Sequence, residues 1–172
     1  MIRQTTRRTT VHQQPREPDD GRDESENERA DRNWNELLQE LRVTQTGTQI
    51  LTGFLLTIPF QQRFADLDAF QKDVYLVLVV LAVLATALFV APVSLHRVLF
   101  RRRLKPELVS AGSGFARAGL VVLSLVMAGS AMLIFDVVLS RQAGWTVGVA
   151  SILLLTVAWW VLPQLLARRA RD

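Results

Sequence analysis

The chain has 172 residues, a net charge of +4 and a composition that is 49% hydrophobic, with two histidines and no cysteine. The lack of cysteine excludes disulfides, thiolate nucleophiles and Cys-based metal sites in this sequence. His12 and His96 are too far apart for a His-ligand cluster. The basic residues flank apolar segments without interleaved aromatic residues, so we expect no nucleic-acid partner.

Residues 1–32 are polar and charged, with one Val, one Ile and no aromatic residue. Such a segment cannot bury enough apolar surface to offset its ordering entropy, so we predict a disordered cytoplasmic tail. The first half of the tail is basic and the second half acidic, which fits either a solvated leader or an interaction tail. It contains no apolar run of the kind found in a secretory signal peptide.

Residues 33–42 carry the signature of a short amphipathic helix. Asn33 and Glu36 have the spacing of a capping box. One apolar stripe follows at helical spacing, formed by Trp34, Leu37, Leu38 and Leu41. We expect this helix to lie at the cytoplasmic membrane interface, with Trp34 as an aromatic anchor.

Residues 43–62 are uncharged and long enough for a first membrane span, but one face is polar. Four side chains fall within an arc of about 100° on a helical wheel, namely Gln45, Thr48, Gln49 and Thr52. This face must look at protein or water rather than lipid. Helix packing, a hydrated path and the binding of a polar headgroup all remain open. Gly47 and Gly53 favour packing, and Pro59 is expected to kink or end the helix.

Three further spans are predicted, over residues 74–95, 116–139 and 145–167. The first of these has no charge in 22 residues, and a helix of that length covers roughly 33 Å, enough for a hydrocarbon core of about 30 Å. Residues 96–115 are expected to form an arginine-rich loop that ends in the flexible sequence SAGSG. Residues 140–144 are expected to form a tight turn, and 168–172 a short C-terminus.

The distribution of basic residues predicts the orientation of the spans. Three cations lie in the proposed outer loops: Arg63, Lys72 and Arg141. Ten lie at the proposed inner ends: Arg42, Arg97, Arg101, Arg102, Arg103, Lys105, Arg117, Arg168, Arg169 and Arg171. We therefore expect a multi-pass protein of the plasma (inner) membrane with both termini in the cytoplasm.

Two positions outside the first span are candidate sites. Asp136 is the one acid inside a predicted span, and an intramembrane acid suggests ion handling. It lies near the outer end, where Arg141 is close enough in sequence to pair with it, so a structural role is the alternative. A basic cluster of His96, Arg97, Arg101, Arg102 and Arg103 fits anionic lipid headgroups or pH sensing through His96, although the positive-inside rule also explains the arginines.

Two stretches have a sequence similar to that of a known family: ELRVTQTGTQIL…FLLTIPFQQRF (residues 40–64) and APVSLHRVLFRR (residues 91–102). They resemble a family of small bacterial four-span membrane proteins of unknown function, whose members sometimes carry an automatic sodium/proton antiporter label. The resemblance covers roughly residues 33–139. It implies a four-span fold and assigns no functional residue.

We therefore predict an all-α, integral membrane four-helix bundle with a short N-terminal interfacial helix and a disordered N-terminal tail. No catalytic residues, cofactor or metal are expected, since the sequence lacks Walker, GxSxG and HExxH motifs. The leading hypothesis is a non-catalytic helix-packing protein, a homo-oligomer or an accessory subunit of a membrane complex. The alternative is a small oligomeric ion or proton permease that uses the polar face of the first span. Headgroup binding by the arginine cluster is a third reading.

Overall fold

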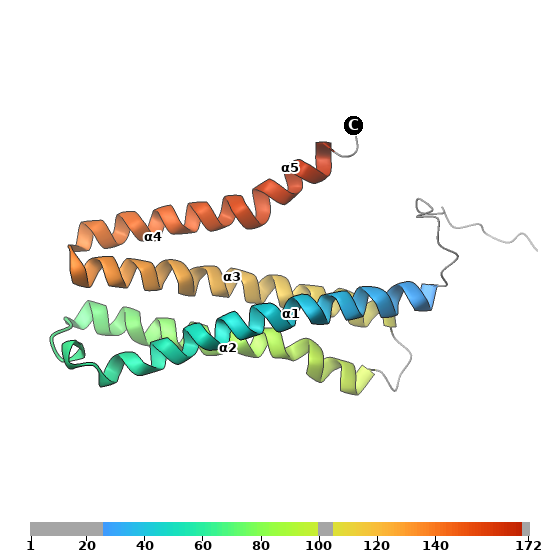
Figure 1. The fold of residues 1–172 in the computed structure, drawn as a ribbon, viewed down its shortest axis with the longest axis horizontal. Helices are drawn as coiled ribbons and strands as arrows, with labels where there is room; N and C mark the ends of the chain where they lie inside the picture. The colour runs from blue at the N-terminus through green and yellow to red at the C-terminus, as the bar shows by residue number, and fades with distance from the viewer. Residues whose placement is uncertain (1–25, 100–104, 170–172) are drawn as a thin grey trace, which may run out of the picture.

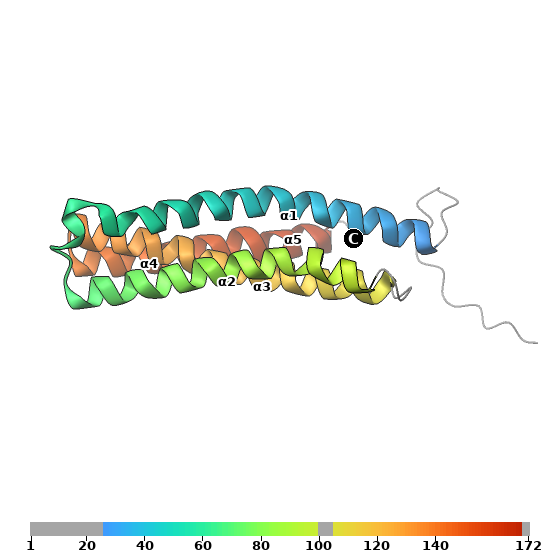
Figure 2. The ribbon, with the colours of Figure 1, turned by 90° about the horizontal axis from the view of Figure 1, so that it is seen from below.

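The computed structural model describes residues 26–99 and 105–169, with the backbone alone at residues 26, 27, 30, 31, 95–99 and 105–109. Every described element is a helix, and four long helices run side by side along one axis (Figures 1 and 2). The all-α fold class is confirmed. Of the predicted tail, residues 1–25 lie outside the described residues, and residues 26–32 are helical.

The elements in chain order are α1 (Glu26–Thr57), the 3₁₀ helices η1 (Ile58–Phe60) and η2 (Gln62–Phe64), α2 (Ala69–Leu99), α3 (Lys105–Val138), α4 (Arg141–Thr156), the π-helical turn η4 (Val157–Val161) and α5 (Leu162–Arg169). Helix α3 is central, because it packs against α1, α2 and α4. We call the end where α1 connects to α2 and α3 to α4 the loop end (left in Figure 1), and the opposite end the terminal end.

Helix α1 combines two segments that the sequence predicts as separate, the interfacial helix of residues 33–42 and the span of residues 43–62. It starts at Glu26, so Asn33 lies inside the helix and its capping-box spacing does not mark the start. No Pro or Gly interrupts residues 26–46, and a helix without a breaker continues where packing supports it. The predicted boundary at residue 43 is therefore wrong.

Packing against α3 explains this continuity. Trp34 and Leu41 are 6% and 4% exposed. A Cβ added to Gly112 of α3 would lie 2.9 Å from Trp34 Cζ3 and 3.0 Å from Leu37 Cδ2, so these side chains sit directly on the α3 backbone. The apolar stripe of residues 34–41 is therefore buried by α3, where the sequence predicts contact with a membrane surface.

The prediction of a loop over residues 96–115 is also wrong, and the same contact explains why. Helix α2 continues to Leu99 and α3 begins at Lys105, so the sequence SAGSG lies within a helix. Glycine is a poor helix former, with a cost of about 1 kcal/mol relative to Ala. At Gly112 the packing of Trp34 outweighs this cost, because any larger residue there would collide with the Trp34 side chain. Tertiary packing overrides the local propensity.

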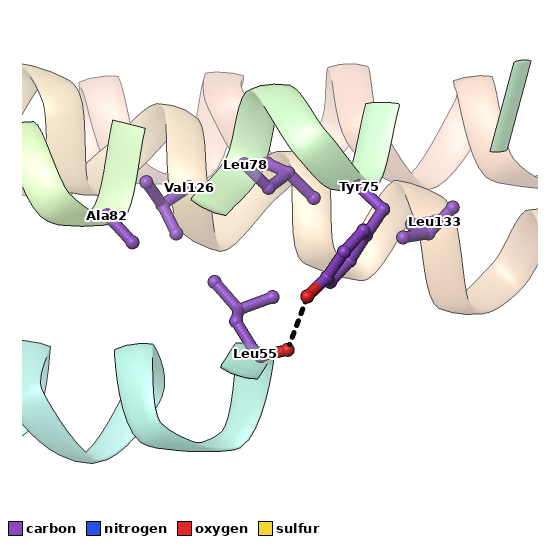
Figure 3. Packing of buried hydrophobic residues seen from close by; sticks show 6 residues of the cluster. All are labelled: Leu55, Tyr75, Leu78, Ala82, Val126 and Leu133. Carbon is purple, nitrogen blue, oxygen red and sulfur yellow. Dashed lines mark hydrogen bonds between the residues drawn. The ribbon is translucent and has the colours of Figure 1, made fainter. Parts of the chain in front are cut away.

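Helix α1 ends next to Pro59, as predicted, and a side chain of α2 hydrogen-bonds to the last turn of α1. Pro59 has no N–H to donate to the carbonyl of Leu55, four residues earlier. The Tyr75 hydroxyl donates to that carbonyl at 3.0 Å, and Tyr75 is 3% exposed (Figure 3). A buried carbonyl that proline leaves without its helical partner is thus satisfied from the neighbouring helix.

Side chains of three helices form the core at the loop-end half of the bundle. Figure 3 shows Leu55 of α1 facing a cluster contributed by α2 and α3. The buried members are Leu55, Tyr75, Leu78, Ala82, Val126 and Leu133. A second cluster toward the terminal end consists of Leu41, Ala85, Phe89 and Leu123. The core therefore belongs to α1, α2 and α3.

Three helical segments are long and apolar enough to cross a membrane, within the described residues: Ala69–Ser94, Ser110–Val138 and Arg141–Arg169. They correspond to the second, third and fourth predicted spans. Helix α1 is not among them, because its polar residues lower its mean hydropathy. The predicted tight turn at residues 140–144 is shorter than expected, since α4 starts at Arg141 with Ser140 as its N-cap.

Candidate functional site

Asp136 lies at the centre of a polar cluster at the loop end. Its side chain is only 3% exposed, and it lies among apolar residues near the end of α3. Gln71 Nε2 of α2 donates to Asp136 Oδ1 at 2.6 Å, and Arg141 Nε of α4 lies 3.2 Å from Asp136 Oδ2. We call Asp68, Gln71, Asp136 and Arg141 the loop-end cluster. One buried carboxylate thus joins three helices.

The cluster closes into a ring through the start of α2. Asp68 and Gln71 form a reciprocal capping pair, in which Gln71 N–H donates to Asp68 Oδ1 at 2.8 Å and Asp68 N–H donates to Gln71 Oε1 at 3.0 Å. Arg141 Nη2 then donates to Asp68 Oδ2 at 2.5 Å. Each end of the Gln71 amide therefore has a partner, and the pair orients the amide toward Asp136.

Arg141 is further held by aromatic side chains. Its guanidinium carbon lies 4.0 Å from the centroid of the Phe70 ring, a cation–π contact. The Phe70 ring is 6.4 Å from that of Trp145. The Arg141 side chain is 39% exposed and that of Asp68 50%, so this side of the cluster meets the surface. Two carboxylates, those of Asp68 and Asp136, thus share one guanidinium.

The backbone of α4 approaches Asp136 through glycine. A Cβ added to Gly144 would lie 2.8 Å from Asp136 Cβ and 2.8 Å from the Met132 carbonyl oxygen. One added to Gly148 would lie 3.0 Å from Met132 Cβ. Gly144 and Gly148 form a GxxxG pattern, which lets two helices pack closely in membranes. The sequence predictions missed this pattern, although its spacing is visible in GWTVG.

The four polar residues of α1 do not share one environment. Gln45 Nε2 donates to the Phe89 carbonyl of α2 at 2.8 Å. Thr48 is 2% exposed and Thr52 is half-buried, and their hydroxyls donate within α1 to the carbonyls of Thr44 and Thr48 at 2.8 Å. Gln49 is exposed. The predicted face is thus split between the bundle and the outside.

The bond from Gln45 meets α2 at a weakened point of that helix. Phe89 lies in the turn before Pro92, which is buried inside α2. Pro92 has no N–H for the carbonyl of Leu88, four residues earlier, and its ring disturbs the turn that contains Phe89. Polar side chains of neighbouring helices satisfy backbone groups at such points in membrane bundles. Gln45 therefore has a structural explanation.

The two glycines that the sequence favoured for packing contact nothing. A Cβ added to Gly47 or Gly53 would have no heavy atom within 4 Å. Both are exposed on the side of α1 that faces away from the bundle. The packing expectation for these two residues within the chain is wrong; Gly112, Gly144 and Gly148 occupy the close contacts.

The basic cluster cannot be placed. His96 and Arg97 belong to the last turn of α2, where the backbone alone is described, and Arg101, Arg102 and Arg103 lie outside the described residues. No group of three His, Cys, Asp or Glu residues that could hold a metal ion occurs within residues 26–99 and 105–169. The side chains of the loop-end cluster are joined by hydrogen bonds and ion pairs.

Sequence reasoning found Asp136 and Arg141 but missed Asp68 and Gln71. The pattern Asp-x-x-Gln directly before an apolar run is a capping signal and could have been recognised. The sequence did not reveal that Gln71 faces Asp136, since this depends on the pairing of α2 with α3.

Residues 23–163 match the model of a family of unknown function, DUF6328. The match extends beyond residues 33–139, which the sequence motifs suggested, at both ends. No curated protein and no solved structure gives a significant match to the chain.

Proposed function

We propose that this chain, which belongs to the DUF6328 family of unknown function, is a non-catalytic four-span membrane protein that acts through helix packing. It works as a homo-oligomer or as an accessory subunit of a membrane complex. Both termini lie in the cytoplasm, and the loop end faces outward. The orientation is supported by the sequence, which has ten cations at the predicted inner ends of the spans against three in the predicted outer loops.

The depth of α1 supports four spans. Gln45 bonds to Phe89, and Leu55 bonds to Tyr75. Residues 45–55 of α1 therefore run beside residues 75–89, which form the middle of the span-length segment Ala69–Ser94. If α2 crosses a membrane, this part of α1 lies at the same depth. A polar helix of this kind is tolerated at such depth where neighbouring helices satisfy its polar groups.

One observation carries the choice of function, namely the enclosure of Asp136. A conducting acid needs contact with water or with an ion path. Asp136 is 3% exposed, and its two oxygens face Gln71 and Arg141. The groove between α3 and α4, of about 300 Å³, has apolar side chains and glycines as its lining, including Met132, Trp145 and Gly148. These features favour a packing role for the acid over ion transfer.

The test combines a mass measurement with a flux measurement. The protein is purified in mild detergent, and the mass of the particle is determined by light scattering. We expect a stoichiometric complex, either with further copies or with another membrane protein. A lone monomer without a partner would contradict the proposal.

The same preparation is reconstituted into liposomes with a sodium or proton gradient. We expect no flux above that of empty liposomes. Flux that Asp136→Asn abolishes would establish the permease alternative in place of the packing role.

A further inference from the structure

Gln49 is the one residue of the predicted polar face of α1 that makes no hydrogen bond within the described bundle. It is exposed, and no hydrogen bond joins its amide to any other part of the chain that the structure describes. Figure 2 shows α1 along one edge of the molecule, with no other helix beyond it. Its neighbours Gln45, Thr48 and Thr52, by contrast, all donate hydrogen bonds.

Gln49 lies halfway across the proposed membrane. The contacts of Gln45 with Phe89 and of Leu55 with Tyr75 place it about level with Val83 of α2. Val83 is close to the centre of the segment Ala69–Ser94. A primary amide that faces hydrocarbon at this depth loses its hydrogen bonds to water and gains none from lipid. A protein partner is the way to satisfy it.

The surface around Gln49 has the spacing of a helix-pairing seam. Thr46, Gln49, Gly53 and Leu56 follow one another along α1 at intervals of three and four residues. All four are exposed, and Leu56 reaches 51%. Alternating steps of three and four residues are typical of two helices that pack at about 20°. We call these four residues the α1 seam.

Two members of the seam suit a close approach. Nothing lies within 4 Å of a Cβ added to Gly53, so the backbone of another helix can reach α1 there. The Thr46 hydroxyl already donates to the Arg42 carbonyl at 3.0 Å, so it brings no unsatisfied donor into an interface. The seam therefore presents one unsatisfied polar group, the Gln49 amide, among small and apolar side chains.

We propose that a second copy of this chain occupies the α1 seam. Two α1 helices pack in parallel around a twofold axis along the bundle, and the two Gln49 amides hydrogen-bond to each other. An amide has both a donor and an acceptor, so it is complementary to its own symmetry mate. A twofold axis along the bundle brings residues of equal depth together. The proposal rests on the proposed function and specifies its homo-oligomer form.

The seam ends where charge would oppose it. Arg42 lies one turn before Thr46 on the same side of α1. By the same contacts it is level with the end of the segment Ala69–Ser94, where the chain leaves the proposed hydrocarbon region. There the two guanidinium groups reach water and salt, which screen their repulsion. A single polar pair in an otherwise apolar seam fixes register and partner number.

The first experiment uses the lack of cysteine in this sequence. Thr46→Cys and Leu56→Cys are placed separately in the full chain, so that the Gln49 amide and the close approach at Gly53 are kept, and membranes are treated with an oxidant. We expect disulfide-linked dimers from both. Leu84→Cys is the matched control, since Leu84 is 44% exposed at similar depth on α2. It should stay monomeric on denaturing gels. Equal cross-linking of Leu84→Cys, or none at either seam position, would overturn the proposal.

The second experiment measures association in mild detergent. We expect Gln49→Leu to weaken dimerisation at least tenfold, and Gly53→Leu to abolish it by blocking the close approach. The conservative Ile50→Leu, also on the exposed side of α1 (57%), should leave dimerisation unchanged. Circular dichroism and unfolding temperature check that each variant retains the monomer fold.

The outcomes separate this inference from the function on which it rests. A dimer that survives both Gln49→Leu and Gly53→Leu would overturn the seam while the packing function stands. A complex with a different membrane protein and no self-association would also overturn the second copy alone. A lone monomer would overturn both.

Discussion

The last span of the molecule is fixed at one end and free at the other. At the loop end, Arg141 joins the loop-end cluster, and Gly144 and Gly148 are buried against α3. At the terminal end, no residue between Val149 and Arg169 is buried. The main contacts of α5 are with η4, the turn that directly precedes it in the chain. Figure 1 shows α5 bending away from α3. The same span therefore has fully buried residues only in its first two turns; beyond them the half-buried Trp159 of η4 packs against the second core cluster, and α5 lies outside it.

Backbone chemistry explains the free end. Leu162 N–H bonds to the Val157 carbonyl, five residues earlier, which makes η4 a π-helical turn. Pro163 follows and has no N–H for the Trp159 carbonyl. Both features bend a helix. No buried residue of α5 holds it against the bundle, so the bend carries α5 outward.

The largest effect is expected from removing the cation of the fixed end. Arg141→Leu leaves the buried Asp136 carboxylate without its ion pair, which should lower the free energy of unfolding by about 3 kcal/mol. Thermal or denaturant unfolding in detergent measures the change. Arg63→Leu, an exposed cation at the same end, should change stability by less than about 0.5 kcal/mol.

A double variant sharpens this prediction. Adding Asp136→Asn to Arg141→Leu removes the unpaired charge and should restore part of the loss. If the double variant is as unstable as the sum of the two single ones, Asp136 and Arg141 do not act as a pair.

The glycine contact should rank next. Gly144→Ala places a Cβ 2.8 Å from the Met132 carbonyl oxygen, a backbone atom that cannot move aside cheaply. We expect a loss of about 1–3 kcal/mol, as for other overpacked sites. Gly47→Ala adds the same methyl group where nothing lies within 4 Å. It should be neutral or stabilise the helix by up to about 1 kcal/mol. Similar losses in the two variants would contradict the close approach of α4 to α3.

A smaller effect is expected at the junction of α1 and α2. Tyr75→Phe keeps the buried ring and removes the hydroxyl that donates to the Leu55 carbonyl. The carbonyl then has neither this donor nor a Pro59 N–H, so the unfolding free energy should fall by about 1 kcal/mol. Chemical denaturation of the two proteins side by side measures it. An unchanged midpoint would mean that another donor serves Leu55.

The smallest effect is expected at the free end. Leu165→Ala shortens a side chain of α5 that is 51% exposed, and should change stability by less than about 0.5 kcal/mol. Leu133→Ala is the buried counterpart on α3, at 6% exposure, and should cost about 2 kcal/mol or more. Equal losses would show that α5 is packed against the bundle after all.

Most of the fold was predictable, whereas the contacts of the candidate site were only partly so. The apolar runs predicted three of the four long helices because crossing length and composition are local properties. Pro59 predicted the end of α1 for the same reason. The failures at residue 43 and in the loop of residues 96–115 share one cause. Trp34 packs on Gly112, a contact between residues far apart in sequence, and it extends both helices.

The sequence by itself determined that the chain is helical, that its apolar segments have the length of membrane spans, and that four polar residues cluster on α1. These properties follow from composition and helical periodicity. The tertiary structure alone decided how each helix is rotated about its own axis. That rotation depends on which neighbour fills which gap, as at Gly112 and Gly144. It turns Gln45 and Thr48 toward the bundle and Gln49 away, and it encloses Asp136 between Gln71 and Arg141.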